Sequence, residues 1–517
     1  MTYVAQDEKT RRSGRFWLPD APEKTVGGWL DLSSRWPLLI LADPLTPSMR
    51  EVSRSISADG TPFSTMVPTD DGQASDSLVI HGMIRNPSGR VTLVGAVTAG
   101  RSEIIGGVVR DPGEQRFRAE YVLVGPHQVG ADATFTMARI RVKHLDSWAN
   151  LPGIAMELAE DWSQITARYE KHEQASAVMA GGRELVLDEV VNLQEPTVLG
   201  AGFKRSVELR LNEPAGLTVD EWWRRFVTPM TELLTMAIGV PCPPVDLKLF
   251  RDENKEWVDV QHPQLREDSG DLLHAYQVFL ARDRLTLDHL ARWLEVAADL
   301  SPIPALVTET ISAHERPLPS QLLEMTIAAE GLHRRLQPKA QVMTRGQKDR
   351  ARKQAKEAVS EELKERVSEA LMHIDAPSYI ERLRYLTNLT REAIPQAAGL
   401  MVASQEEQKL DTTKGWEDRI KAVRNGFAHQ APRRDDAPDD KEWQEQVILL
   451  RTLYWVLAAA LLLQTGVEPA KLRERIENYE PYRALLRQAR QWLPAIYVVQ
   501  PTCPPTEHLA ASSTLED

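Results

Sequence analysis

The hydrophobic pattern changes its period near residue 270, and this change divides the chain into two kinds of structure. Before it, short apolar or alternating runs recur between turn residues, which is typical of antiparallel β-sheets. After it, apolar residues recur at helical spacing, and short polar or proline-bearing links separate the segments. At 517 residues the chain is also too long for one ordinary core. The sequence therefore predicts an α+β protein, with a β-rich N-terminal region (a sandwich or an open barrel) followed by an all-α bundle.

The same pattern gives expected boundaries. The β-rich region is predicted at 1–265, with a break between two subdomains near 150–180, and it is followed by a helical linker at 266–314, a bundle at 315–498 and a disordered tail at 499–517. Strands are expected at 36–41, 77–82, 90–95, 117–124, 183–187, 206–211, 245–250 and 256–260. Helices are expected at 219–238, 271–281, 287–297, 320–336, 359–373, 378–390, 416–427, 441–465 and 469–492. The first of these has Thr218 as its N-cap and Glu221 three residues later.

Composition excludes several classes of protein. A net charge of −12 argues against a protein that coats nucleic acid non-specifically, although an acidic body can carry a local basic groove. The two cysteines, Cys242 and Cys503, form neither a disulfide framework nor a metal-ligand cluster, so no metal and no other cofactor is expected. The N-terminus has no apolar core of a signal peptide. The apolar run 447–463 contains Arg451, which favours a helix buried in the bundle over a membrane span, and the chain is expected to be cytoplasmic.

The short segment that best combines phosphate binding with proton transfer is Arg424-Asn425-x-x-x-His429. An arginine holds phosphate through two parallel donors, and a histidine exchanges protons near neutral pH. Asn425 either orients the ribose or the histidine, or caps the helix end. Five residues of unbroken helix would rotate His429 about 140° away from Arg424, so we expect the helix to break near Gly426. Without further context, such a motif is more often structural than catalytic.

Two further groups are candidates for supporting roles. Glu330, His333 and Arg334 have the spacing i, i+3, i+4 and share one helical face, which is either a solvated, ion-paired face or a support for the site. The segment 345–356 carries six basic residues and one acidic residue, and it either grips an RNA backbone or forms a solvated loop and helix start. Its basic residues are Arg345, Lys348, Arg350, Arg352, Lys353 and Lys356. Trp222 and Trp223, at helical spacing with Phe226, are interpreted as core residues.

The C-terminal helices with Arg424, Asn425 and His429 resemble HEPN domains, and the stretch 324–336 is similar to the first long helix of that family. The stretch 135–148, a strand followed by Leu-x-x-Trp, resembles the N-terminal domains of ApeA-like anti-phage proteins. The resemblance implies a homodimeric, metal-independent ribonuclease that cuts host tRNA in abortive anti-phage defence. It also implies an N-terminal region that senses a phage-derived trigger.

The chemistry of RNA agrees with that implication, because the 2′-OH is a built-in nucleophile and its attack gives a 2′,3′-cyclic phosphate without a metal. One histidine per chain does not readily perform both proton transfers. A symmetric dimer would bring two arginines and two histidines to one groove. Two alternatives stay open: a non-catalytic HEPN-like scaffold that binds RNA or protein, and a toxin restrained by a separate antitoxin.

Overall fold

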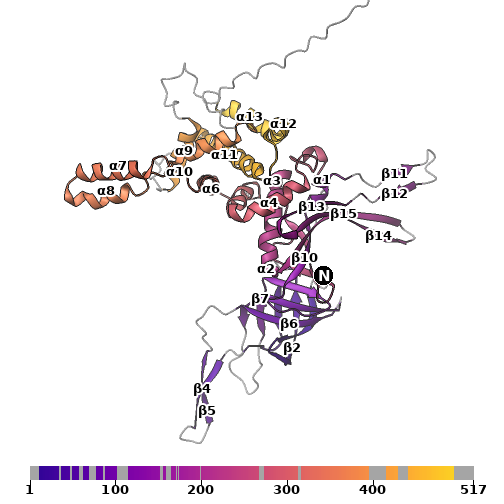
Figure 1. The fold of residues 1–517 in the computed structure, drawn as a ribbon. Helices are drawn as coiled ribbons and strands as arrows, with labels where there is room; N and C mark the ends of the chain where they lie inside the picture. The colour runs from indigo at the N-terminus through magenta and orange to yellow at the C-terminus, as the bar shows by residue number, and fades with distance from the viewer. Residues whose placement is uncertain are drawn as a thin grey trace, which may run out of the picture. The chain divides into compact units, whose positions relative to one another are not determined.

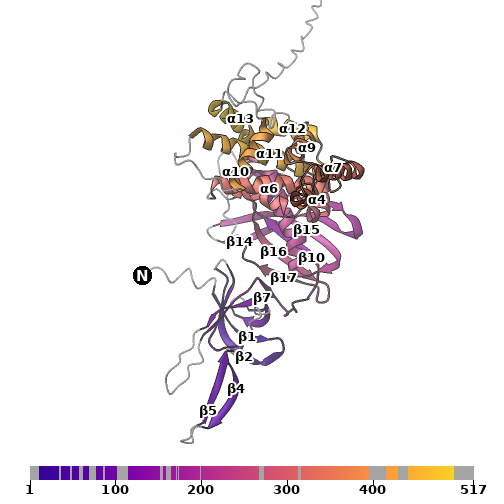
Figure 2. The ribbon, with the colours of Figure 1, turned by 90° about the vertical axis from the view of Figure 1, so that its left-hand side faces the viewer.

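The computed structural model divides the chain into two compact units, Met1–Ala298 and Asp299–Asp517. It describes residues 11–33, 36–46, 49–56, 62–68, 77–85, 88–101, 114–151, 155–158, 165–170, 172, 174–197, 200–266, 273–312, 316–394, 415–428 and 440–493. Their arrangement confirms the predicted α+β class, with a β-rich N-terminal region and a helical C-terminal region (Figures 1 and 2). The dividing point falls inside the segment predicted as a linker, whereas the predicted tail lies outside the described residues.

Six strands of the first unit close into an antiparallel barrel. Their order is β7-β6-β1-β2-β3-β8, and β8 pairs again with β7. The interior is filled by large apolar side chains such as Phe16, Leu30 and Phe117, none of which is exposed. The strands are β1 (Arg11–Leu18), β2 (Ala21–Asp31), β3 (Leu38–Leu41), β6 (Leu78–Ile84), β7 (Gly89–Arg101) and β8 (Gln115–Arg118).

The sheet continues beyond the barrel through β9, which pairs with both β7 and β17. From β17 the order is β16-β10-β15-β14-β13, with every pairing antiparallel. These strands are β9 (Tyr121–Gly125), β10 (Phe135–Val142), β13 (Ala175–Val178), β14 (Glu184–Thr197), β15 (Gly200–Leu217), β16 (Pro244–Arg251) and β17 (Glu256–Gln261). Two separate hairpins pair β4 (Met49–Ile56) with β5 (Pro62–Pro68) and β11 (Ala155–Leu158) with β12 (Ile165–Arg168).

A helix packs on the outer sheet and begins where the sequence predicts. Thr218 and Glu221 form the expected capping box, and the helix continues through α2 (Val219–Trp222), the π-helical turn η3 (Trp223–Val227) and α3 (Thr228–Ile238). Trp222 is fully buried, and its indole N–H donates to the carbonyl of Phe135 at 2.9 Å. Trp223 is also buried. The interpretation of these tryptophans as core residues is therefore confirmed. Two short helices complete the unit, α1 (Leu145–Ala149) and η2 (Ala180–Gly182).

The second unit is a bundle around the apolar helix α11, and Trp416 of α10 bonds Thr452 of α11 at 2.9 Å inside it. Among the described residues, α11 is the one helix long and apolar enough to span a membrane, but 78% of its most apolar stretch lies buried within the protein. The burial of α11 agrees with the prediction of a helix buried in the bundle. The helices are α5 (Ile303–Ser312), α6 (Leu318–Leu336), α7 (Arg345–Glu357), α8 (Lys364–Ala370), α9 (Tyr379–Thr390), α10 (Trp416–Ala428), α11 (Asp440–Gln464), α12 (Pro469–Asn478) and α13 (Glu480–Trp492), with α4 (Leu287–Leu300) at the boundary.

Several sequence predictions of elements are wrong. The described part of 271–281 contains only the 3₁₀ turn η4 (Ala275–Gln277), and 359–373 contains η5 (Glu361–Leu363) and the short α8. The strand expected at 117–124 is split into β8 and β9. The helix expected at 469–492 breaks at Tyr479, which has extended dihedrals, because Pro481 fits only the first turn of a new helix. The sequence analysis did not predict strands β1, β2, β4, β5, β11, β12 and β13 or helices α1, α5 and α7.

Candidate active site

Helix α10 is held in place by two buried side chains one turn apart, Trp416 and Ile420. Arg424 follows Ile420 by one further turn, so it lies on the same side of the helix, where the buried face meets solvent. Its side chain keeps 31% of its surface exposed. The helix therefore presents the guanidinium at the edge of the bundle, neither enclosed in the core nor free in solvent.

Arg424 is fixed by residues from two other helices. Its guanidinium donates to the carboxylate of Glu330 on α6 at 2.9 Å, and its Cζ lies 4.8 Å from the ring centroid of Tyr379 on α9. The Tyr379 hydroxyl in turn donates to the carbonyl of Thr326 at 3.2 Å. Burial raises the pKa of Tyr379, so this ring stays a neutral phenol that supports the cation through its π face.

Glu330 bridges two arginines. One of its oxygens accepts from Arg424, and the other accepts from Arg334 one turn further along α6, at 2.7 Å. The exposed fractions of the Glu330 and Arg334 side chains are 23% and 64%. Two guanidinium groups share a single carboxylate here, so the cluster keeps a net positive charge. Of the two interpretations of this helical face from sequence, the solvated and ion-paired face fits Glu330 and Arg334.

His333 does not lie on that solvated face. It is 3% exposed, its ring meets Tyr385 edge to face, and its Nδ1 lies 3.3 Å from an Arg382 guanidinium nitrogen. Because an arginine only donates, Nδ1 accepts and the proton of the neutral ring is on Nε2. Burial, followed by the positive charges of Arg382 and Arg334, lowers the pKa of His333. The residue is therefore a neutral imidazole that positions Arg382.

Glu330, Arg334, Tyr379, Arg382 and Arg424 border a surface hollow of about 830 Å³. Arg334, Arg382 and Arg424 contribute three positive charges to its wall, and Glu330 contributes one negative charge. The rest of the lining comes largely from the segments on either side of the α7–α8 hairpin: Pro338, Ala340, His373, Ile374, Ala376, Pro377 and Ser378. A hollow of this size with an excess of guanidinium groups suits a phosphate-bearing ligand. Sequence reasoning missed Tyr379 and Arg382, although their i, i+3 spacing behind the Ser378 cap was a readable signal.

The predicted helix break inside the motif is wrong. α10 continues through Gly426 to Ala428, and Gly426 is not among the glycines with positive φ. Asn425 is half-buried within the helix, so it does not cap a helix end at its own position. Glycine at this position has helical neighbours on both sides, and they hold it in the helix despite its low propensity. His429 lies outside the described residues.

The six predicted RNA-binding residues all lie on one helix. α7 begins with a capping box between Thr344 and Gln347, and none of its residues is buried. It pairs with α8 as a hairpin, which extends away from α9 and α10 (Figure 1). Arg352 of α7 donates to Ser368 of α8 at 3.2 Å, and Lys348 of α7 pairs with Asp375, which follows α8, at 2.6 Å. Arg345, Arg350 and Lys356 have no ion pair with any described residue, so their charges face solvent.

No group of three or more histidine, cysteine, aspartate or glutamate side chains that would hold a metal occurs in the described part of the chain. The hollow also contains none of the paired carboxylates that Mg²⁺ prefers. What the arrangement offers is fixed positive charge beside a partly open cavity.

Two family models match the chain. The model of ApeA N-terminal domain 1 matches residues 11–280, just over half of the chain, and the model of the Apea-like HEPN domain matches residues 323–471. The resemblance predicted from sequence is thereby confirmed in both halves. No curated protein and no solved structure matches. HEPN domains are of RNase type with a role in defence, and they generally bind RNA and often dimerise.

Proposed function

This chain belongs to the ApeA-like family, in which an ApeA N-terminal domain precedes a HEPN domain, and from this premise we propose that it is a metal-independent endoribonuclease. The observation that carries the proposal is the position of Arg424, which is fixed by Glu330 and Tyr379 at the wall of a positively charged hollow. The proposed substrate is host tRNA, and the proposed role is abortive anti-phage defence.

The reaction follows from the chemistry of RNA. The 2′-oxygen attacks the adjacent phosphorus, the bond from phosphorus to the 5′-oxygen breaks, and the product is a 2′,3′-cyclic phosphate. Arg424 stabilises the charge that builds on the non-bridging oxygens, and His429 removes the proton of the 2′-OH or supplies one to the departing 5′-oxygen. Asn425 orients the ribose from the same helix. DNA lacks the 2′-OH and resists cleavage.

Glu330 has a definite part in this proposal. It holds Arg424 in the absence of RNA, and a bound phosphate competes with it for the same donors. Arg334 then balances the charge of Glu330 when Arg424 turns to the substrate. Arg382 lies in the same wall and provides a second contact for the RNA backbone.

The proposal requires a second copy of the chain. A single histidine does not carry out both proton transfers in one pass, whereas two motifs facing one groove supply a base and an acid. α7 extends the basic surface: its exposed arginines and lysines lead away from the hollow and suit the backbone of a folded RNA.

The decisive experiment incubates the purified protein with bulk tRNA in EDTA and compares it with Arg424→Ala and His429→Ala. Cleavage by the unmodified protein, lost in both variants and retained in Lys421→Ala, supports the proposal. Lys421 is the matched control because it is an exposed cation on the same helix. Cleavage that depends on added Mg²⁺, or that survives both substitutions, contradicts it.

One observation favours a second candidate, a non-catalytic HEPN-like scaffold that binds RNA. Glu330 already contacts the Arg424 guanidinium at 2.9 Å, in the place that a substrate phosphate would need. In the same assay, a scaffold would bind tRNA without cutting it.

A further inference from the structure

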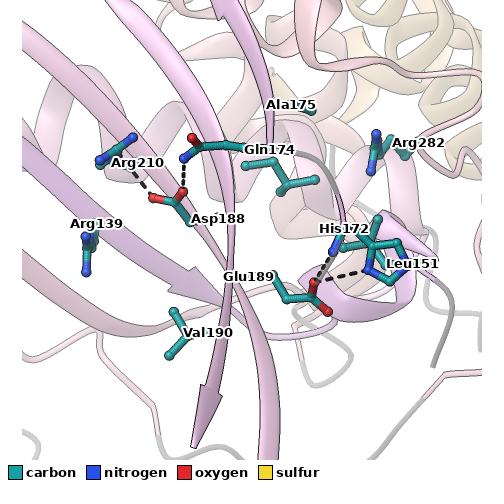
Figure 3. A pocket seen from close by; sticks show the side chains of 11 residues that line it. Arg139, Leu151, His172, Gln174, Ala175, Asp188, Glu189, Val190, Arg210 and Arg282 are labelled. Atoms are coloured by element: carbon teal, nitrogen blue, oxygen red, sulfur yellow. Dashed lines mark hydrogen bonds and ion pairs between the residues drawn. The ribbon is translucent and has the colours of Figure 1, made fainter. Parts of the chain in front are cut away.

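The N-terminal unit contains a pocket that the proposed nuclease does not use. It has a volume of about 200 Å³ and lies beside Asp188, Glu189 and Val190 of β14 (Figure 3). β13 stops pairing with β14 at Leu187, so the pocket opens where the flanking strand ends. Figure 3 shows Arg139 and Arg210 on one side of it and Arg282 on the other.

The carboxylates of this pocket are already paired. Asp188 accepts from Gln174 and lies 3.2 Å from Arg210. Glu189 is almost fully buried and lies 3.1 Å from the His172 ring and 3.2 Å from the Arg205 guanidinium. Burial is the largest single influence and raises the pKa of Glu189, but the hydrogen bonds with His172 and Tyr169 and the charge of Arg205 together lower it. Neither acid needs a ligand for charge balance.

Two further arginines line the pocket, and one of them, Arg139, acts through its charge on the buried carboxylate of Glu208. Neither Arg139 nor Arg282 forms an ion pair with any residue in the described ranges. Arg139 stacks its guanidinium on the Trp257 ring at 4.3 Å, and its Nε is buried without a hydrogen bond. The Nε of Arg210 and the Oδ2 of Asp188 form an ion pair at 3.2 Å, but both atoms are buried without a hydrogen bond. Buried donors of this kind are costly unless an acceptor reaches them, and an anionic ligand supplies acceptors.

A second hollow of about 680 Å³ adjoins the pocket and shares Leu151, His172, Ala175 and Arg282 with it. The rest of the lining of this second hollow is acidic and polar, and it contains no arginine among the described residues. Asn150, Ser176, Thr286, Asp283 and Asp288 line it, and they offer oxygen acceptors and hydroxyls. An acidic wall repels a second anion and accepts hydrogen bonds from hydroxyl and amino groups.

We propose that this two-part pocket binds a nucleotide. The phosphate enters the inner pocket between Arg139, Arg210 and Arg282, and the sugar and base, with their hydroxyl and amino donors, occupy the outer hollow. The combined volume suits a ligand of that size. Phosphate alone would satisfy the arginines but leave the outer acceptors unused. The site lies wholly within the first unit, so it does not depend on the proposed nuclease.

The test is calorimetric titration of the full-length protein with AMP, GMP, CMP, UMP and inorganic phosphate. At least one nucleotide is expected to bind at least tenfold more tightly than phosphate. Arg282→Ala should weaken that nucleotide at least tenfold, and Asp288→Asn should weaken it while leaving phosphate binding unchanged. Arg292→Ala, an exposed cation of α4 outside the pocket, is the matched control and should bind as the unmodified protein does.

Three results would overturn the proposal: no nucleotide binds at millimolar concentration, phosphate binds as well as every nucleotide, or Arg282→Ala binds normally. Binding is also measured for Arg424→Ala. If that substitution abolishes binding, the nucleotide is held by the helical unit and the assignment is wrong. Because the readout is binding and not cleavage, an inactive nuclease leaves the result interpretable. Circular dichroism and the melting temperature confirm that Arg282→Ala is folded.

Discussion

Arg424 and Glu330 are 94 positions apart in the chain, and their contact gives the candidate active site its character. Such a pair contributes little to stability when partly exposed, about 0–1 kcal/mol. The pair matters for geometry, because it holds the Arg424 guanidinium at the hollow and leaves it able to bind phosphate. At the scale of single residues, the charge on Glu330 sets how strongly Arg424 is held.

Removing that charge should release Arg424 toward RNA. We expect Glu330→Gln to bind tRNA about two- to fivefold more tightly, because about 0.5–1 kcal/mol of ion pairing no longer competes with phosphate. Fluorescence anisotropy with labelled tRNA, in a His429→Ala background that prevents cleavage, measures the effect. Glu324→Gln is the control, since Glu324 lies on the same helix but pairs with Arg316. Weaker binding by Glu330→Gln would mean that the carboxylate is needed to position Arg424.

A histidine of the N-terminal unit should make stability depend on pH. His262 packs between Trp223 and Tyr121, and burial, followed by the charge of Arg266, lowers its pKa to about 4. The unfolded chain takes up this proton near pH 6.5. Between these values the unfolded state binds more protons, so stability is complete above pH 6.5 and falls as the pH drops toward 4.

We expect His262→Phe, which keeps an aromatic ring, to remove part of this dependence, about 1–3 kcal/mol between pH 7 and 4. Melting temperatures across that range test it. His274→Phe, at an exposed position of the same unit, should leave the pH profile unchanged. An unchanged profile in His262→Phe would show that the pKa of His262 is the same in the folded and unfolded states.

At the scale of elements, sequence reasoning succeeded where local signals and tertiary packing agree. The capping box at Thr218 and the long apolar stretch of α11 were both readable, because caps and continuous apolar runs act locally. The prediction of a helix at 271–281 failed, because the apolar residues there have helical spacing but pack without forming a helix. Sequence reasoning also failed at α7, whose sequence is too polar to show an apolar face. In the site, Arg424 was readable, whereas the roles of Tyr379 and Arg382 depend on the packing of α9 against α6 and α10.

The continuous course of α10 leads to a prediction about Gly426. Nothing lies within 4 Å of a Cβ built at this position, so alanine fits and restricts the unfolded chain. Gly426→Ala should stabilise the helical unit by about 0.5–1 kcal/mol. Urea denaturation measures the difference. Gly239→Ala is the contrasting variant. Gly239 ends α3 with φ near 85°, so alanine at this position should destabilise the protein. Destabilisation by Gly426→Ala would imply a conformation there that only glycine adopts.

The α7–α8 hairpin should contribute to RNA affinity through charge alone. Replacing Arg345, Arg350 and Lys356 with glutamine should reduce the slope of log K against log salt by about 2–3, because each phosphate contact accounts for about 0.7–0.9. Folding should be unaffected, since no residue of α7 is buried. Equal neutralisation of Arg224, Arg225 and Arg292 in the first unit is the control. Equal slopes for both triple variants would assign α7 a purely structural role.

At the scale of the whole molecule, the proposed chemistry asks for more than one chain supplies. Arg424 offers charge stabilisation, and His429 offers one proton transfer at a time, so two chains are needed to supply a base and an acid together. The second unit is an all-helical domain, and symmetric pairing of such domains brings identical motifs together across a two-fold axis. The proposal therefore makes the oligomeric state part of the mechanism.

Mixed dimers test this requirement directly. An unmodified chain and a His429→Ala chain, carried on different affinity tags and purified together, form a dimer with two arginines but only one histidine. If one groove needs a base and an acid from two chains, this dimer should be as inactive as a dimer of two His429→Ala chains, although one of its motifs is intact. The control pairs an unmodified chain with an Arg424→Ala chain; it keeps both histidines and one arginine, and it should retain part of the cleavage. Substantial cleavage by the dimer with one histidine would mean that each chain cuts RNA with its own arginine and histidine, and pairing then serves stability alone.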